Sequence, residues 1–352
     1  MLRTLSLSIL GLAVLAVTIN CGKSSSTTAG PLMYVTLASS NQVQGYTVSG
    51  TTLKATSTFT TGKFPSSVVV HPTKKFAYVA NQTDNTITVY TVDKGGSLTE
   101  VTPRPSTNAG PVSLAIDAKG VFLAVADSGG ADVIVFAIDA TTGKLSQLTV
   151  TALGFVPNAV VISPSGKYLY TANSNGSSIS AFALGASGTV TPVAGSPFAA
   201  GFDPASIAID PAEKFLYAAN LLDGNVSAYS IDSTGALQAL ASSPIATGVN
   251  PSSVAIDSSG KFLYVTNSGS SNVAGFNIGS DGALTVISGS PFTTGANPLF
   301  VAVDPNRGFV ATAEGSGQQV EVFTLAGSGT LAAATGSPYK VSATPSSVFI
   351  TK

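Results

Sequence analysis

The stretch PSSVAIDSSGKFLYVTNSGSSNVAGFNI, residues 251–278, holds three short runs of strand-forming residues separated by Gly, Ser, Asp and Asn. Its central run, FLYVTN at 262–267, has close relatives earlier in the chain: FAYVAN at 76–81, YLYTAN at 168–173 and FLYAAN at 215–220. Runs of β-branched and aromatic residues bounded by turn formers predict strands. The chain is therefore built from repeated units of short strands.

Each unit opens with a proline, and successive prolines are 46 or 47 residues apart. They are Pro65, Pro111, Pro157, Pro204, Pro251, Pro298 and Pro345. An aromatic residue recurs in the third strand, at Tyr46, Tyr90, Phe136, Phe182, Tyr229, Phe276 and Phe323. A glycine recurs in the turn after it, at Gly96, Gly143, Gly188, Gly235, Gly282 and Gly329. A repeat of this length with four strands predicts a propeller blade.

The two ends of the repeat array complete each other. Residues 31–53 supply the last three strands of a unit without its first strand, and PSSVFITK at 345–352 supplies a first strand alone. Pairing them closes the ring and removes two exposed sheet edges. We therefore predict an all-β protein, one seven-bladed β-propeller over residues 31–352 with four antiparallel strands in each blade.

The N-terminal residues differ from the repeats. Arg3 precedes the apolar run LSLSILGLAVLAVTI at 5–19, which is too short to span a bilayer and is typical of an export signal. The run ends at Cys21, the only cysteine, and so resembles the signal of bacterial lipoproteins. That resemblance implies a signal peptide over 1–20, a tether over 21–30, lipid attachment at Cys21 and a place in the cell envelope. An ordinary secretory signal is the alternative.

The charge balance limits the possible partners. Lys and Arg number 16 and Asp and Glu 17, and charged residues make up 9% of the chain. A balanced surface of this kind lacks the basic footprint that nucleic acid requires. We expect a monomer whose partners are the membrane, through the anchor, and a protein, glycan or small molecule.

Tyr264–Asn267 is the YVTN repeat phrase, and the frame P-x-x-[AV]-x-D-x-x-G-K-[FY]-L-Y-V-[AT]-N surrounds it, with G-S-P-F later in the unit. This pattern resembles the lactonase-family propellers, which include 6-phosphogluconolactonase-like proteins. The resemblance covers the chain from residue 31 onward. It implies the propeller fold and, as one activity found among such proteins, lactone opening.

Residues that recur in most blades are interpreted as structural. The position that closes the second strand is occupied by Asn81, Asp127, Asn173, Asn220, Asn267 and Glu314. Short amides and carboxylates there can bond the local backbone. His71, the only histidine, fills a turn position that holds Asp or Ser in most other blades, and Arg307 lies in the same turn of its own blade. Both are predicted to lie opposite the channel entrance.

Ligand sites in a propeller are expected where the first strands begin, at the mouth of the central channel. The candidate binding residues there are Lys63, Asn108, Asp127, Asn158, Asp203, Asn250, Asn297 and Glu314, with Phe155 and Phe202 beside them. The sequence has no recognisable nucleophile–base set, metal-ligand cluster or cofactor motif, so we predict no catalytic residue, metal or cofactor.

Three functions remain open, one of which is a repeat-built surface protein with a purely structural role. The first is a lipid-anchored envelope propeller that binds a partner through its channel mouth without catalysis. The second is an exported lactonase-type hydrolase in which Asp127, Asp203 or Glu314 activates water.

Overall fold

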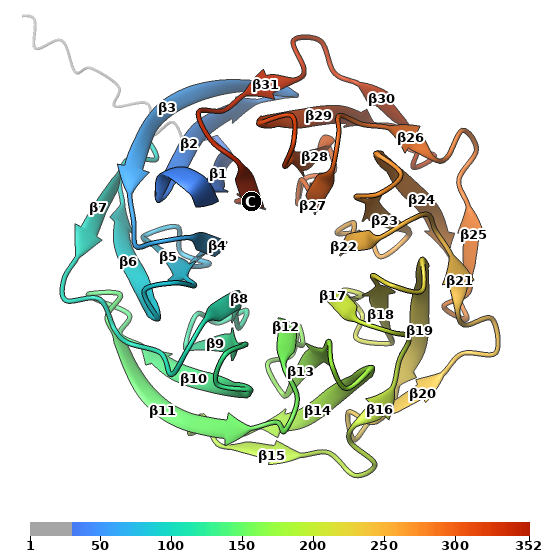
Figure 1. Ribbon diagram of the computed structural model, residues 1–352, viewed down its shortest axis with the longest axis horizontal. Coiled ribbons are helices and arrows are strands. Elements are labelled where there is room, and N and C mark those ends of the chain that lie inside the picture. The colour runs from blue at the N-terminus through green and yellow to red at the C-terminus, as the bar shows by residue number, and fades with distance from the viewer. Residues whose placement is uncertain (1–29) are drawn as a thin grey trace, which may run out of the picture.

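The computed structural model describes residues 30–352, so the predicted signal peptide and Cys21 lie outside the described residues. Seven antiparallel sheets surround a central channel, as Figure 1 shows. This arrangement confirms the seven-bladed propeller predicted from the repeat. Within residues 30–352, no helix is long and apolar enough to cross a membrane.

The first strand of each blade lies next to the channel. We number the blades 1 to 7 by these strands, which are β4 (Pro65–Val70), β8 (Pro111–Ile116), β12 (Pro157–Ile162), β17 (Pro204–Ile209), β22 (Pro251–Ile256), β27 (Pro298–Val303) and β32 (Pro345–Ile350). The second strands, in the same blade order, are β5 (Phe76–Asn81), β9 (Phe122–Asp127), β13 (Tyr168–Asn173), β18 (Phe215–Asn220), β23 (Phe262–Asn267), β28 (Phe309–Glu314) and β1 (Leu32–Leu37).

The third and fourth strands lie progressively farther from the channel. The third strands are β6 (Thr86–Val92), β10 (Asp132–Ile138), β14 (Ser178–Leu184), β19 (Asn225–Ile231), β24 (Asn272–Ile278), β29 (Gln319–Leu325) and β2 (Gln42–Ser49). The fourth are β7 (Leu98–Val101), β11 (Leu145–Ala152), β15 (Val190–Pro192), β20 (Leu237–Ala239), β25 (Leu284–Val286), β30 (Leu331–Ala333) and β3 (Thr52–Thr60). Blades 3 to 6 add two-residue strands, β16 (Phe198–Ala199), β21 (Ile245–Ala246), β26 (Phe292–Thr293) and β31 (Tyr339–Lys340), which also pair with their third strands.

Blade 7 is assembled from both ends of the ring, as predicted. Strand β32 pairs antiparallel with β1, and Tyr34 lies opposite Phe349. The Leu32 amide donates to Thr351 Oγ1 over 2.9 Å, and the Thr351 amide donates to the Leu32 carbonyl over 2.9 Å. The closing contact therefore uses the same ladder as the other blades.

The core lies between the blades. The second strands are buried on both faces, because each is sandwiched between two neighbouring sheets, and their apolar side chains fill the blade-to-blade clusters. In five blades the tyrosine of this strand also donates to the carbonyl of the recurrent turn glycine in the next blade. The repeated phrase is therefore scaffold, as the sequence predicted.

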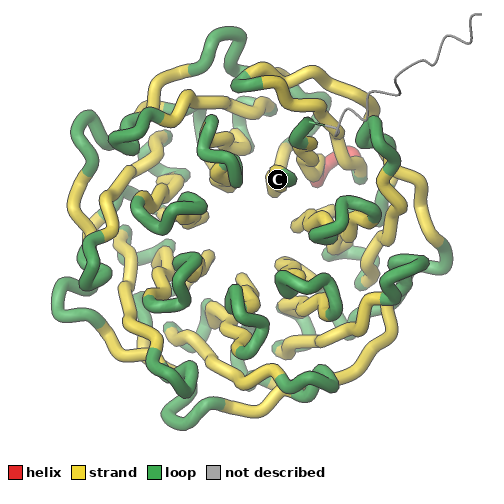
Figure 2. The backbone as a smooth tube through the Cα atoms, turned by 180° about the vertical axis from the view of Figure 1, so that it is seen from behind, coloured by secondary structure: helices red, strands yellow, loops and turns green. Residues whose placement is uncertain are grey.

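The loops divide between two faces. The connections from each fourth strand to the next first strand, and from second to third strands, lie on one side, which we call the entry face. The turns between first and second strands lie on the other side, which we call the opposite face and which Figure 2 shows towards the viewer. The entry face therefore holds the channel mouth at which the candidate residues were predicted.

Candidate functional site

The channel is a cavity of about 470 Å³ lined by the first strands. Serine hydroxyls in its wall join neighbouring blades: Ser66 donates to the Pro111 carbonyl over 2.9 Å, and Ser252 and Ser346 make the same bond to the next proline. These hydroxyls hold the ring together, and they are already engaged with backbone acceptors. Phe300 of blade 6 and Phe349 of blade 7 also line the cavity and make that side of its wall more apolar.

Two of the predicted residues meet at the entry end of this cavity. Asn158 Nδ2 of blade 3 donates to Asp203 Oδ1 of blade 4 over 3.1 Å, and both side chains are half-buried. The Asp203 carboxylate is therefore fixed at the mouth by a neighbouring blade. One carboxylate and one amide, planar groups that carry both acceptors and a donor, face the same mouth.

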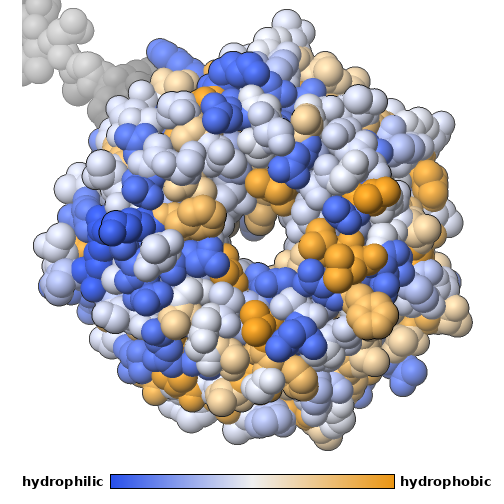
Figure 3. Space-filling model, viewed as in Figure 1, coloured by the Kyte–Doolittle hydropathy of each residue, from blue (hydrophilic) through white to orange (hydrophobic). Residues whose placement is uncertain are grey.

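Apolar side chains lie beside this pair. The position two residues before the blade proline is occupied by Phe155, Phe202 and Val249 in blades 3 to 5, and by Lys63, Ala109, Ala296 and Ala343 elsewhere. Phe202 is 65% exposed and Val249 59%, and Leu222, 70% exposed, lies next to Phe202 through a backbone hydrogen bond. Figure 3 shows apolar atoms gathered on one side of the channel mouth. We call Phe155, Phe202, Leu222 and Val249 the apolar arc.

The position just before the blade proline has a conformational role. Asp203, Asn250 and Asn297 all have φ between +53° and +60°, in the left-handed region that short polar side chains tolerate best. In each case the residue's carbonyl accepts a backbone amide from the loop after the second strand. Asn250 and Asn297 are thus accounted for by the turn, whereas Asp203 also contacts Asn158.

Asp127 and Glu314 are fully buried inside blades 2 and 6, not exposed on the rim. Burial raises the pKa of Asp127 to about 6 and the pKa of Glu314 to about 8. Asn108 donates to Asp132 rather than facing the channel, and Lys63 is exposed on the rim of blade 1. Of the three carboxylates that the hydrolase hypothesis named, Asp203 alone is accessible at the mouth.

His71 and Arg307 are engaged on the opposite face. The Thr73 amide donates to His71 Nδ1 over 3.1 Å, which leaves Nε2 to donate to the Gly120 carbonyl of blade 2 over 2.9 Å. Arg307 Nε lies 2.6 Å from Asp257 Oδ2. Both residues join neighbouring blades, in agreement with the structural interpretation of these turns.

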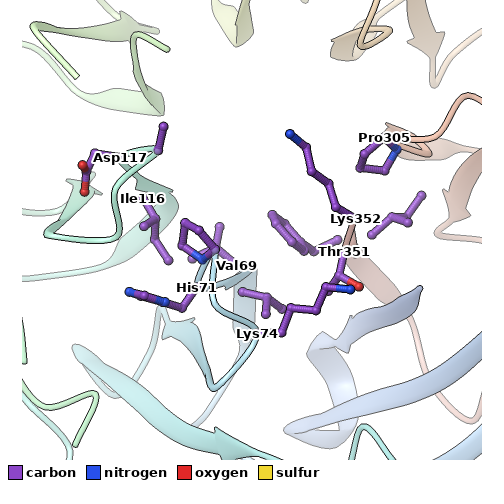
Figure 4. A pocket seen from close by; sticks show the side chains of 13 residues that line it. Val69, His71, Lys74, Ile116, Asp117, Pro305, Thr351 and Lys352 are labelled. Atoms are coloured by element: carbon purple, nitrogen blue, oxygen red, sulfur yellow. The ribbon is translucent and has the colours of Figure 1, made fainter. Parts of the chain in front are cut away.

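A second cavity, of about 320 Å³, opens at the opposite end of the channel. Figure 4 shows the polar His71, Lys74 and Lys352 and the apolar Val69 and Ile116 among its lining residues. This cavity was not among the sites predicted from the sequence. The ends of first strands line it, and the signal that could have found it is a lysine shortly after the end of β4, Lys74, and of β32, Lys352.

Comparison with known families identifies the chain. The model of the family described as "Lactonase, 7-bladed beta-propeller" matches residues 26–158, 156–247 and 233–344. The chain belongs to this lactonase family. No curated protein matches it at a significant level.

Solved structures agree on the fold of this lactonase-family propeller. A proposed 6-phosphogluconolactonase from Bacteroides fragilis is 20% identical, with a TM-score of 0.82 over 93% of this chain and 99% of that chain. The periplasmic gluconolactonase of Pseudomonas aeruginosa is 19% identical, with a TM-score of 0.81 over 92% of this chain and 99% of that one. At such identities the likeness shows a shared fold and nothing more.

Proposed function

We propose that this lactonase-family propeller binds a small, uncharged, polyhydroxylated ligand of the sugar or sugar-lactone class at its entry-face mouth. The observation that carries the proposal is the Asn158–Asp203 pair next to the apolar arc. Sugar rings have apolar C–H faces that pack on aromatic side chains, and hydroxyls that bond to planar carboxylates and amides. Blades 3 and 4 bring both kinds of group to one side of the mouth.

The charges at the mouth favour a neutral ligand. Lys63 is the cation among the candidate residues at this entrance. It lies in blade 1, whereas Asn158 and Asp203 lie in blades 3 and 4. A phosphorylated ligand would call for Arg forks or clustered Lys. Arg307 and Lys74, by contrast, lie on the opposite face.

Lactone hydrolysis at the same mouth is the second candidate function, and family membership favours it. Asp203 would act as the general base that activates water, since it is the accessible carboxylate there. The Asn158 amide would hold that carboxylate and, once released from it, could donate to the developing oxyanion. Asp127 and Glu314 have no part in this version, because both are fully buried.

A panel of aldonolactones and the matching free sugars tests both functions. Binding is measured by calorimetry, and hydrolysis by acid release at constant pH. Asp203→Asn keeps the left-handed turn, because Asn250 has the same conformation in blade 5. Phe202→Ala shortens the apolar arc, and Leu148→Ala, on exposed strand β11, is the control.

We expect binding without turnover, weakened at least tenfold by Asp203→Asn or Phe202→Ala and unchanged by Leu148→Ala. Turnover that Asp203→Asn abolishes would instead establish the hydrolase. Absence of both binding and turnover across the panel would contradict both functions.

We also propose that the protein is exported and held in the cell envelope by acylation of Cys21. The apolar run at 5–19 that ends on a lone cysteine supports this, as does the periplasmic gluconolactonase among the similar structures. Fractionation of cells that express the full chain should place it with membranes. Cys21→Ser should release it, and an unchanged membrane fraction would contradict the anchor.

A further inference from the structure

Blade 1 shows a second strand whose terminal side-chain amide is fully hydrogen-bonded. Thr61 Oγ1 donates to Asn81 Oδ1 over 2.7 Å, while Asn81 Nδ2 donates to Thr86 Oγ1 over 3.1 Å and to Thr88 Oγ1 over 2.9 Å. Asn173 and Asn220 make the same two side-chain bonds with residues five and seven positions later. The amide is essential here, because it supplies the donors for neighbouring oxygens.

Blade 2 has the same geometry but lacks these donors. Thr107, Asp127, Asp132 and Ile134 occupy the positions of Thr61, Asn81, Thr86 and Thr88. Asp127 and Asp132 lie directly opposite each other on β9 and β10. A carboxylate therefore replaces the amide, another replaces a hydroxyl, and an isoleucine replaces the last partner.

Local donors satisfy only half of the carboxylate oxygens. The Ala109 amide donates to Asp127 Oδ2 over 2.9 Å, and Asn108 Nδ2 donates to Asp132 Oδ2 over 2.5 Å. Asp127 Oδ1, Asp132 Oδ1 and Thr107 Oγ1 are all buried without a hydrogen-bond partner. Their residues are 0%, 4% and 8% exposed, respectively.

The orphaned oxygens belong to one cluster. Thr107 holds the position of Thr61, whose hydroxyl contacts the Asn81 side chain over 2.7 Å, so its hydroxyl is placed towards Asp127, although no side-chain contact there meets hydrogen-bond geometry. The ion pairs among residues 30–352 involve Arg104 and Arg307, and neither reaches these two aspartates. Two buried carboxylates without a cation are strongly unfavourable, because desolvation penalises each charge and the like charges repel.

We propose that blade 2 binds one hard divalent cation of the Ca²⁺ class between Asp127, Asp132 and Thr107. Carboxylate and hydroxyl oxygens suit such an ion, and Ca²⁺ accepts irregular geometry with water completing its shell. The ion would join the loop at 107–110 to the β9–β10 hairpin. In blade 2 it would thus connect the same segments that the hydrogen bonds of Asn81 connect in blade 1.

Blade 6 has the other acidic pair but does not offer the same cluster. Thr312 donates its hydroxyl to Glu314, the Gly295 amide donates to Glu321, and Lys340 donates to Gln319 beside them. One carboxylate oxygen of Glu314 remains without a partner there. Glu314→Gln is therefore a matched control in the equivalent position of a different blade.

The test uses the full chain after removal of metals with EDTA. Calcium binding is measured by calorimetry, and thermal unfolding is followed with EDTA, with millimolar CaCl₂ and with KCl at equal ionic strength. The variant Asp127→Asn with Asp132→Thr restores the asparagine and threonine that blade 1 has at positions 81 and 86. Thr107→Val removes only the proposed hydroxyl ligand and leaves both carboxylates in place. It therefore tests the site even if the double variant does not fold.

We expect the wild type to bind about one equivalent of Ca²⁺ and to melt about 2–6 °C higher with it. The double variant should lose both effects, Thr107→Val should bind several-fold more weakly, and Glu314→Gln should respond as the wild type does. A wild type that is indifferent to calcium would overturn the site, and so would an equal response in the double variant. A double variant that is more stable than an unresponsive wild type would show that the pair shares a proton instead.

Discussion

The Tyr264 hydroxyl of blade 5 donates to the Gly329 carbonyl of blade 6 over 2.7 Å, and the tyrosine is fully buried. Gly329 has φ +85°, a conformation that favours glycine, and this turns its carbonyl towards the neighbouring blade. The recurrent tyrosine and the recurrent turn glycine, 65 residues apart in this pair, therefore recur together because they form one interblade hydrogen bond.

Tyr264→Phe should lower the free energy of unfolding by about 1–2 kcal/mol, because a buried carbonyl loses its donor. Urea unfolding measures the change. Tyr168→Phe is the control, since its hydroxyl bonds the Ser233 carbonyl at an exposed site and water can replace it. Equal losses in the two variants would contradict the importance of burial.

Removal of residues 345–352 should abolish cooperative unfolding, because β1 would lose its partner strand and the ring its closing contact. Calorimetry and near-ultraviolet circular dichroism would show this. Lys352→Ala, beyond the end of β32, should leave the transition intact. A shortened chain that melts at the full-length temperature would contradict closure through blade 7.

Glu314 should make the protein less stable as the pH rises. Its carboxyl ionises near pH 4.5 in the unfolded chain, whereas burial raises the folded pKa to about 8. Between these values the folded state holds one proton more, so this group lowers the free energy of unfolding by about 1.4 kcal/mol per pH unit.

Glu314→Gln should remove that contribution, so its unfolding free energy relative to the wild type should increase from pH 5 to about pH 8. Urea unfolding at successive pH values tests this. A difference between the two proteins that stays constant with pH would show that Glu314 does not hold a proton in the folded state.

Arg307→Ala should lower the free energy of unfolding by about 1–3 kcal/mol. The guanidinium contacts the Asp257 carboxylate, whose side chain is 0% exposed, and its Cζ lies 5.5 Å from the Phe262 ring centroid. Arg104→Ala provides the contrast, because its pair with Glu100 is partly solvated and worth at most about 1 kcal/mol. A larger loss in the Arg104 variant would contradict this ranking.

The fold could be predicted almost completely from the sequence. Blade boundaries follow from the spacing of the prolines, and closure follows from the missing first strand at 31–53. The two-residue strands such as β16 were not anticipated. They depend on pairing with the third strand across a loop, and two residues carry no periodic signal.

The site was less predictable, because side-chain direction at a strand end is set in three dimensions. Asp127 and Glu314 close their strands, which suggested a rim position, but the pleat turns both towards the residue five positions later. The Asn158–Asp203 contact joins two blades and depends on how closely they approach. Val249 was missed, although comparing the position two before each proline across the blades would have grouped it with Phe155 and Phe202.

The hydrogen bonds between Leu32 and Thr351 also fix the face of the propeller at which the chain enters and leaves the ring. Both residues lie at the end of blade 7 that carries the Lys352 cavity, so the polypeptide joins the wheel on the side remote from Asp203. The aperture beside Asp203 and the point at which residue 32 enters the ring therefore lie at opposite ends of the channel axis. The C-terminus, on that remote side, is therefore a suitable point for immobilising the protein on a sensor.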